Sequence, residues 1–324
     1  MDRLIMAAVV LVGVPAALVG YILLTELALK PFHHRQARRI RPWLWLAPAL
    51  AMVAALLVYP SLDTIRRSFM DRNSREFLGA DNYAWFFGRS DTFEIIRNNV
   101  LWLVFLTGLA VGLGLLIAIL VDKVRYESLA KAFIFMPMAI SFVAASAIWR
   151  FVYDARPGNE SQRGLLNGLV TAFGGVPVDW LQSEPLNNLF LIIVGTWMQT
   201  GFCMVILSAG LKGISTELLE AARVDGANEW QVFRRIILPL LAPTMAVVAT
   251  TMMIFALKAF DIVYVMTSGN FGTEVIANRM YSELFATAQP HLGRASAIAV
   301  VLFLAIVPIM LFNIKRFREQ EAMR

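Results

Sequence analysis

The feature that most constrains this chain is the absence of Asp, Glu, Lys and Arg from seven long stretches. A helix needs about 17–25 residues to cross the roughly 30 Å of hydrocarbon in a bilayer, and every stretch is long enough. Lipid offers no hydrogen-bond partners to the backbone, so such spans should be helices, whereas barrel strands would alternate in polarity. The sequence therefore predicts an all-α, polytopic membrane protein with about seven transmembrane helices. The charge-free stretches are 4–25, 42–62, 98–121, 132–149, 185–211, 236–257 and 295–314.

Two prolines and a group of three glycines within these stretches bear on how the helices pack. Pro137 and Pro308 interrupt two predicted helices, where a kink is tolerable because neighbouring helices can satisfy the freed carbonyl. Packing irregularity and a gating hinge remain alternative interpretations of these two prolines. Gly108, Gly112 and Gly114 form a row of small residues that predicts close packing against another helix.

The residues that usually build metal sites and catalytic centres are sparse. Cys203 is the only cysteine, which excludes an intrachain disulfide and a cysteine metal cluster. The histidines His33, His34 and His291 lack ligand spacing, so we expect no metal site. The sequence shows neither paired carboxylates nor a nucleophile with a base at a spacing that would indicate a catalytic site. The sequence lacks the Gly-x-x-x-x-Gly-Lys-Ser/Thr loop that binds nucleotide phosphates, so we expect no cofactor on this chain.

The basic residues gather on one side of the predicted membrane topology. With the N-terminus outside and the C-terminus in the cytoplasm, the cytoplasmic segments hold sixteen basic and eight acidic residues, against ten and thirteen outside. Anionic lipid explains the net charge of +6 without a nucleic-acid partner. The cytoplasmic segments are 30–42, 122–131, 212–235 and 315–324, and the outward ones are 1–3, 61–95, 150–186 and 267–292.

The first apolar stretch is interpreted as a retained anchor. Its apolar region is longer than that of a signal peptide, no Ala-x-Ala cleavage site follows, and a basic cluster comes next. We therefore expect an anchor helix with a basic cytoplasmic linker at 1–40 and one transmembrane domain at 41–324. Outside the spans, 61–95 and 150–186 are rich enough in aromatic residues, Gly and Pro to predict short interfacial helices and turns.

The segment 212–239 between the fifth and sixth spans is predicted to form two short helices around a glycine. Ser215 or Thr216 can cap the first helix, with Glu220 near its positive end. Gly226 supplies the left-handed turn that stops it.

The second helix of this segment is expected to begin near Asn228. Trp230, Phe233 and Ile237 then share one side at helical spacing. On the first helix, small side chains would let another protein approach closely and two acidic groups offer charges for docking. These docking residues are Glu220, Ala221, Ala222 and Asp225.

Seven residues of this loop carry a family resemblance: Glu220, Ala221, Ala222, Gly226, Ile236, Leu238 and Pro239. In their spacing and position, they resemble the loop signature of permease subunits in binding-protein-dependent ABC importers. The resemblance implies that the first short helix is a coupling helix seated in a cleft of an ATPase subunit. It assigns coupling to Glu220, Ala221, Ala222, Asp225, Gly226, Leu238 and Pro239.

The resemblance also implies the partners and the location of the chain. Two copies of an ATPase subunit would bind and use ATP and Mg, and this chain would bind neither ATP nor Mg. A second, different permease and a soluble or lipid-anchored sugar-binding protein would complete the importer. The complex would lie in a bacterial cytoplasmic (inner) membrane, in contact with membrane lipid.

A sharper resemblance, over about residues 40–320, is to carbohydrate permeases. It is carried by 43–60, 186–211 and 257–267. Many such permeases have a Gly-Gly-Pro turn at the position of residues 268–275, and this chain lacks that turn. In this segment, and also in 164–167 and 178–181, the chain resembles alpha-glucoside or glucosylglycerol permeases. The resemblance implies import of an alpha-glucoside, a related disaccharide or a glycoside. The family that the chain resembles has a minimal core of six helices, and the first span of this chain is additional to it. How residues 1–40 pack is therefore left open.

Polar and aromatic side chains within the spans are candidates for the sugar path, because sugars offer hydroxyl groups and weakly apolar ring faces. Trp197, Gln199, Phe260 and Tyr264 have this chemistry, although packing is an alternative role for each aromatic. Charged residues in a span tend to face a cavity or a partner. Asp261 is therefore a further candidate, and its spacing from Lys258 also allows a neutralising ion pair.

The alternative function is an ion-driven carrier or a solute channel, which would need no ATPase. Its polar sites would lie in broken helices near the midplane. The signature around Glu220 argues against this alternative.

Overall fold

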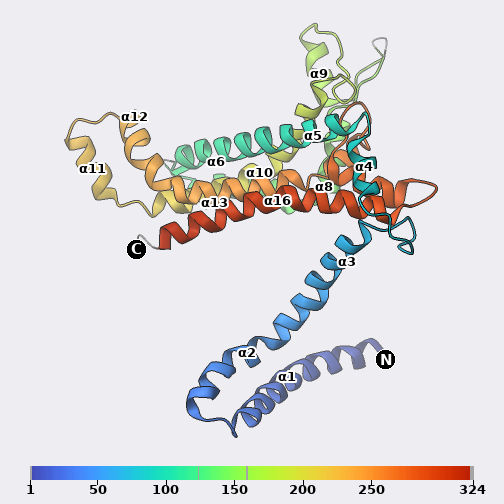
Figure 1. Cartoon of the computed structure of the whole chain (residues 1–324). Helices are drawn as coiled ribbons and strands as arrows, with labels where there is room; N and C mark the ends of the chain where they lie inside the picture. Colours follow the sequence, from blue (N-terminus) through green and yellow to red (C-terminus); the bar gives the residue numbers. More distant parts are fainter. Residues whose placement is uncertain (1, 123, 158–159, 322–324) are drawn as a thin grey trace. The chain divides into compact units, whose positions relative to one another are not determined.

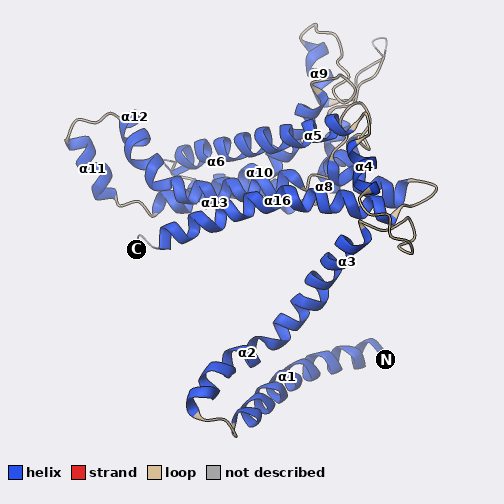
Figure 2. Cartoon of the chain, in the orientation of Figure 1, coloured by secondary structure: helices blue, strands red, loops and turns tan. Residues whose placement is uncertain are grey.

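The computed structural model describes residues 2–122, 124–157 and 160–321, and within these ranges no strand occurs beyond an isolated bridge between Met70 and Phe77 (Figure 2). Six helical stretches are long and apolar enough to cross a membrane, and a bent pair of helices raises the number to seven. The prediction of an all-α membrane protein with about seven spans is confirmed.

The chain divides into two compact units, residues 1–66 and 67–324. In the first unit the hydroxyl of Tyr21 donates to the carbonyl of Leu44, and Arg41 lies 2.9 Å from Glu26. These contacts join two helices whose apolar side chains are almost all exposed, as expected of surfaces that face lipid or other helices. The predicted division at residue 40 concerns topology and stays a prediction. The elements of this part are α1 (Asp2–Leu29), α2 (His34–Val53), η1 (Ala54–Val58) and α3 (Tyr59–Arg67).

The second unit contains the remaining elements, in which η marks a short 3-10 or π turn. They are α4 (Asp81–Phe87), α5 (Thr92–Leu101), η2 (Trp102–Leu106), α6 (Thr107–Asp122), α7 (Glu127–Phe135), η3 (Met136–Ala139), α8 (Phe142–Val152), α9 (Leu165–Ala172), α10 (Asn187–Lys212), α11 (Thr216–Val224), α12 (Glu229–Val232), η4 (Phe233–Ile237), α13 (Leu238–Leu257), α14 (Asp261–Met266), α15 (Ile276–Tyr281), η5 (Ser282–Ala286) and α16 (Leu292–Glu321).

The long helices α6, α10, α13 and α16 lie side by side (Figure 1). Their core includes the fully buried Trp102 and Leu106. A Cβ added at Gly114 would lie 2.5 Å from the Cβ of Cys203, so α6 and α10 approach closely there. Gly108 and Gly112 have no such neighbour within 4 Å. The predicted close packing is therefore confirmed for Gly114, and for Gly108 and Gly112 it stays a prediction.

The fourth span is broken rather than kinked. Its two halves, Glu127–Ala139 and Phe142–Val152, are bent by 97°. Pro137 lies in the 3-10 turn η3, Ile140 is extended, and the hydroxyl of Ser141 accepts a hydrogen bond from the Ala144 amide to cap α8. The prediction of one helix over 132–149 is wrong, because an apolar run does not reveal a cap within it. Pro308, in contrast, lies inside the single helix α16.

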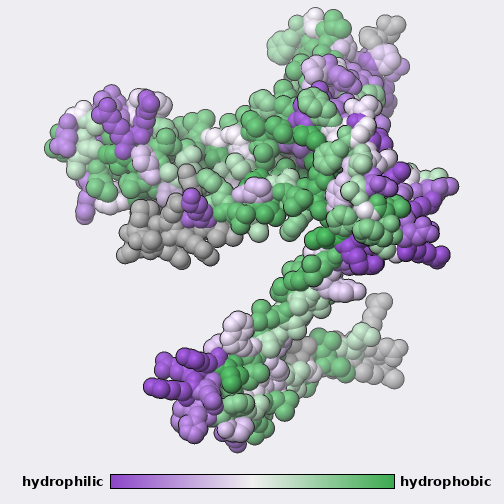
Figure 3. Space-filling model, in the orientation of Figure 1, coloured by the Kyte–Doolittle hydropathy of each residue, from purple (hydrophilic) through white to green (hydrophobic). Residues whose placement is uncertain are grey.

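Short helices occupy the two ends of the bundle. Figure 1 shows α11 and α12 at one end and α4, α8 and α9 at the other. Figure 3 shows hydrophobic residues along the long helices and hydrophilic residues gathered toward the ends. The helices α4 and α9 confirm that 61–95 and 150–186 contain short helices.

Candidate functional site

The loop 212–239 is built as two helices around a left-handed glycine. Gly226 has a φ of 81°, and a Cβ added there would meet nothing within 4 Å, so the backbone angle alone favours glycine. The Ala227 amide donates to the Ala222 carbonyl at 3.0 Å and closes the end of α11. Ser215 occupies the N-cap position of α11, but its side chain makes no capping bond.

The second helix begins where the sequence predicts. The Asn228 side chain accepts from the Gln231 amide at 2.9 Å, and the Gln231 side chain accepts from the Asn228 amide at 2.9 Å. This reciprocal capping box satisfies two amides that would otherwise lack partners. The rings of Trp230 and Phe233 lie 5.6 Å apart, in agreement with their predicted shared face.

An ion pair that the sequence analysis missed joins the two helices. The Nε of Arg223 lies 2.8 Å from a carboxylate oxygen of Glu229. This hydrogen bond raises the pKa of the Arg223 guanidinium. The spacing of six residues across a turn is not a helical spacing, so only the fold reveals the contact.

Residues of α11 divide between two faces. Glu220, Ala221 and Asp225 are exposed, and Ala222 is half-buried. Leu218 and Val224 add exposed apolar surface to this helix, with Val224 88% exposed, and the sequence analysis did not single them out. The small side chains let another protein approach closely, and the acidic groups can pair with a basic surface on such a partner.

The inner side of α11 borders a cavity of about 510 Å³, together with the ends of α6 and α10 and the beginning of the sixth span. Leu219 and Arg223 of α11 line it, opposite Trp230, Phe233 and Ile237. Below the cavity, Leu238 is half-buried and Pro239 is exposed at the start of α13. The helical backbone runs from α12 through η4 into α13, so displacement of the loop reaches a membrane span directly.

The candidate path residues fall into two groups. Gln199 is buried on α10, and the half-buried Trp197 makes an edge contact with Trp149 at 5.6 Å. Phe260 and Tyr264 stack at 5.2 Å in the second group. No ring contact among the described residues joins the two groups.

Tyr281 and Phe285 extend the second group, although the sequence analysis did not select them. The Tyr281 ring lies 4.9 Å from both Phe260 and Tyr264, and 5.0 Å from Phe285. These four rings form an aromatic chain, a name we use for Phe260, Tyr264, Tyr281 and Phe285. Their spacing of four at 260–264 and at 281–285 is the only sequence signal for it.

The predicted ion pair between Lys258 and Asp261 is absent from the described residues. Helix α13 ends at Leu257 and α14 begins at Asp261, so the two charged residues do not share a helix face. Lys258 is exposed and Asp261 is half-buried at this break. The spacing argument fails because the helix stops between them.

Four asparagines clamp the loop that follows α14. Asn98 donates to the carbonyls of Gly272 and Glu274 at 2.7 and 2.9 Å, and Asn188 donates to Gly272 at 3.0 Å. Asn187 donates to Phe271, and Asn99 accepts from the Ile276 amide. Burial of Glu274 raises the pKa of its carboxyl group.

Residues 110–318 match the family of binding-protein-dependent transport system inner membrane components. The chain is 54% identical over 281 residues, 87% of its length, to all of the osmoprotective compounds uptake permease protein GgtC of Synechocystis sp.. It is 47% identical to the alpha-glucoside transport system permease protein AglF of Rhizobium meliloti, over 87% of this chain and 83% of that one.

A solved structure supports the fold. A chain of a bacterial ABC transporter that imports the acidic polysaccharide alginate superposes with a TM-score of 0.73 at 22% identity, over 88% of this chain and 99% of that one. The loop geometry, the spans and the sequence match agree. The chain therefore belongs to the family of binding-protein-dependent transport system inner membrane components.

Proposed function

We propose that the chain is the membrane permease subunit of an ABC importer that takes up a small sugar, an alpha-glucoside or a related glycoside. Two similar proteins support this substrate class, since one is an alpha-glucoside permease and the other takes up osmoprotective compounds. Family membership supports multi-pass insertion in the inner membrane.

The observation that carries this proposal is the construction of the loop 212–239. It presents Glu220 and Ala221 on the exposed helix α11, with Asp225 directly after it, and beyond the Gly226 turn the helical backbone runs from α12 through η4 into α13. An ATPase that holds α11 can therefore move a membrane span. Glu220, Ala221, Ala222 and Asp225 act as contacts, and Gly226, Leu238 and Pro239 shape the loop and its junction with the span.

A chain that couples to an ATPase without binding ATP itself needs separate partner subunits. Two copies of a separate ATPase bind and hydrolyse ATP with Mg, and this chain is not itself catalytic. A second, different permease completes the path, and a soluble or lipid-anchored binding protein delivers the sugar. Closure of the ATPase pair moves the coupling loops, and rigid-body rocking of the spans exchanges outward and inward access.

The sugar path uses aromatic faces and amides of the spans. The aromatic chain offers stacking surfaces near the break between α13 and α14, where Asp261 begins the second helix. Trp197 and Gln199 of α10 contribute at a second position along the path. This placement supplies the ring faces and hydrogen-bonding groups that sugar recognition needs.

The orientation follows from the basic segments. The loop 212–239 and the C-terminus lie in the cytoplasm, and the N-terminus lies outside. The excess of Lys and Arg in the cytoplasmic segments supports this arrangement.

One observation favours an ion-driven carrier as the second candidate function. Two helices are broken, at 140–141 and at 258–260, and carriers often place polar sites at such breaks. The two candidates differ in their energy source, so ATP-dependent uptake separates them.

The experiment is uptake of labelled glucosylglycerol and an alpha-glucoside by proteoliposomes that contain the purified complex and its binding protein. Uptake that requires internal ATP and survives collapse of the ion gradients supports the importer. Uptake that follows an ion gradient without ATP contradicts it. Failure of both sugars, with ATP-dependent uptake of an unrelated solute, overturns the substrate class alone.

A further inference from the structure

The segment 154–180, which links α8 to α10 and carries α9, is fixed from within by Asn167. This side chain is fully buried, and its amide donates to the carbonyls of Asp154 and Val178 at 3.1 and 2.9 Å. Its oxygen accepts from the Val178 amide at 2.9 Å and from the Trp180 indole at 3.2 Å. These bonds hold both ends of the segment to one side chain, so α9 has a defined place on the bundle.

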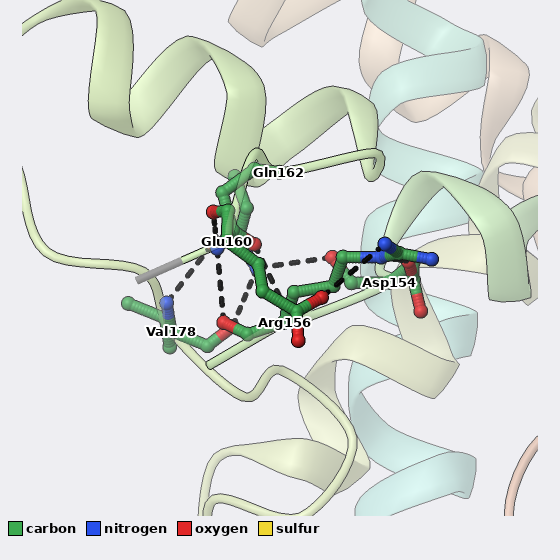
Figure 4. A network of polar contacts seen from close by, with 6 residues as sticks. Asp154, Arg156, Glu160, Gln162 and Val178 are labelled. Atoms are coloured by element: carbon green, nitrogen blue, oxygen red, sulfur yellow. Dashed lines mark hydrogen bonds and ion pairs between the residues drawn. The ribbon is translucent and has the colours of Figure 1, made fainter. Parts of the chain in front are cut away.

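Polar contacts gather on one part of this segment (Figure 4). The Arg156 amide donates to the Gln162 side chain at 3.0 Å, and that side chain donates to the Arg156 carbonyl at 2.9 Å. The guanidinium of Arg156 lies 3.3 Å from Glu160. The polar groups of Arg156, Glu160 and Gln162 are thus engaged with one another at the side of the segment that precedes α9.

The outer face of α9 and the turn after it have the opposite character. Leu165, Leu169 and Phe173 follow at intervals of four residues, and Phe173 and Val176 are 89% and 80% exposed. Residues 164–178 contain no charged residue. Figure 3 shows hydrophobic residues gathered over α9. A fixed, charge-free apolar face of this kind marks a contact with a partner or a membrane.

The direction of α9 and its surroundings favour the membrane surface. Figure 1 shows α9 standing across the direction of α6, α10 and α13, at the end of the bundle opposite α11. Since those helices cross the membrane, α9 runs along its plane. Arg163 and Asp179 flank the charge-free run in the sequence and would meet polar headgroups if that run entered lipid. Ile148 and Phe151, on the helix α8 that contacts α9, are also exposed.

We propose that α9 and the following turn are an interfacial anchor, with Leu165, Leu169, Phe173 and Val176 buried in the lipid leaflet at the end opposite the coupling loop. The amphipathic pattern, with Leu and Phe outward and Asn167 inward, is that of helices that lie in the membrane interface. This anchor restrains the outer end of the broken fourth span, because Asn167 of α9 bonds to the carbonyl of Asp154, two residues after α8 ends. The inference rests on the membrane spans and not on the identity of the transported solute.

The test measures the depth of nitroxide labels placed on single cysteines. Cys203→Ala removes the only thiol of this chain, and Leu169→Cys, Phe173→Cys and the control Glu160→Cys then each receive one label, with the Cys203→Ala complex as the background for thiols on other subunits. The complex is placed in phospholipid nanodiscs, and collision rates with oxygen and with a water-soluble nickel chelate are compared. Oxygen collisions should exceed nickel collisions at 169 and 173, and nickel collisions should exceed oxygen collisions at 160.

Two outcomes would overturn the anchor. Nickel access at 173 equal to that at 160 would place the face in water, and low access to both reagents at 173 would show that another protein covers it. A second variant guards against a folding defect. Phe173→Asp should reduce the depth of the label at 169 while the complex still elutes as one species.

Discussion

The guanidinium of Arg223 lies 2.8 Å from the carboxylate of Glu229 and ties α11, the proposed coupling helix, to the helix that leads into the sixth span. Both side chains are largely exposed, so solvent screens the pair and it contributes little to stability. Its importance lies in geometry, because it limits how far α11 can move independently of the span.

Charge reversal at this pair should therefore weaken coupling without unfolding the protein. Arg223→Glu and Glu229→Arg, each alone, should lower sugar-stimulated ATP hydrolysis by the reconstituted complex. The double variant that exchanges both charges should recover much of the loss. Equal losses in the single and the double variants would show that the pair itself does not matter.

The contact between Gly114 and Cys203 gives a prediction about packing. Gly114→Ala places a methyl group 2.5 Å from the Cys203 Cβ and should destabilise the protein by about 1–3 kcal/mol, the usual cost of overpacking. Gly108→Ala is the matched control, since its Cβ would meet nothing within 4 Å. Thermal unfolding in detergent should show a lower midpoint for the first variant, and equal midpoints would refute the close approach.

Glu274 predicts a pH dependence of stability. Burial raises the pKa of this carboxyl group, so the folded state holds its proton more tightly than the unfolded state. The stabilisation of the folded state by protonated Glu274 is fully present below the pKa of the unfolded state, and it is lost as the pH rises through the pKa of the folded state. Glu274→Gln keeps an acceptor for Asn278 and should raise the unfolding temperature at neutral pH, with the gain shrinking in acid. A gain that grows as the pH falls would contradict the sign.

The aromatic chain predicts a change in affinity for sugar. Tyr264→Ala and Tyr281→Ala each remove a ring contact worth about 0.5–1.5 kcal/mol, which corresponds to about a two- to tenfold higher half-saturating concentration in uptake. Phe77→Ala is a control, because Phe77 is exposed and stacks on Phe69 outside this group. Unchanged half-saturation in both tyrosine variants would remove the aromatic chain from the path.

Local patterns in the sequence predict much of this fold and the general form of the loop. Charge-free runs reveal the spans, because a charge is costly in lipid. Gly226 and Asn228 reveal the turn and the second helix, because each satisfies a local backbone requirement. The exposure of Glu220 on α11 and of Asp225 directly after it follows from the same local reasoning.

The remaining features depend on contacts between distant segments. Asn98 reaches Gly272 and Glu274 across more than half of the chain, and no local pattern links these residues. The break at Ser141 lies within a run that is apolar throughout, so hydropathy cannot locate it. The pairing of Lys258 with Asp261 is wrong for the same reason, since the spacing of three applies only within an unbroken helix.

The most direct test of coupling through the loop is ATP hydrolysis by the complete complex in proteoliposomes, with and without a sugar-loaded binding protein. Wild type is compared with Glu220→Lys, and with Glu76→Lys as an exposed glutamate at the other end of the chain's second unit. We predict that stimulation by the loaded binding protein is lost in Glu220→Lys and retained in Glu76→Lys, while both complexes still insert and purify. Full stimulation in Glu220→Lys would contradict the assignment of this loop to the ATPase.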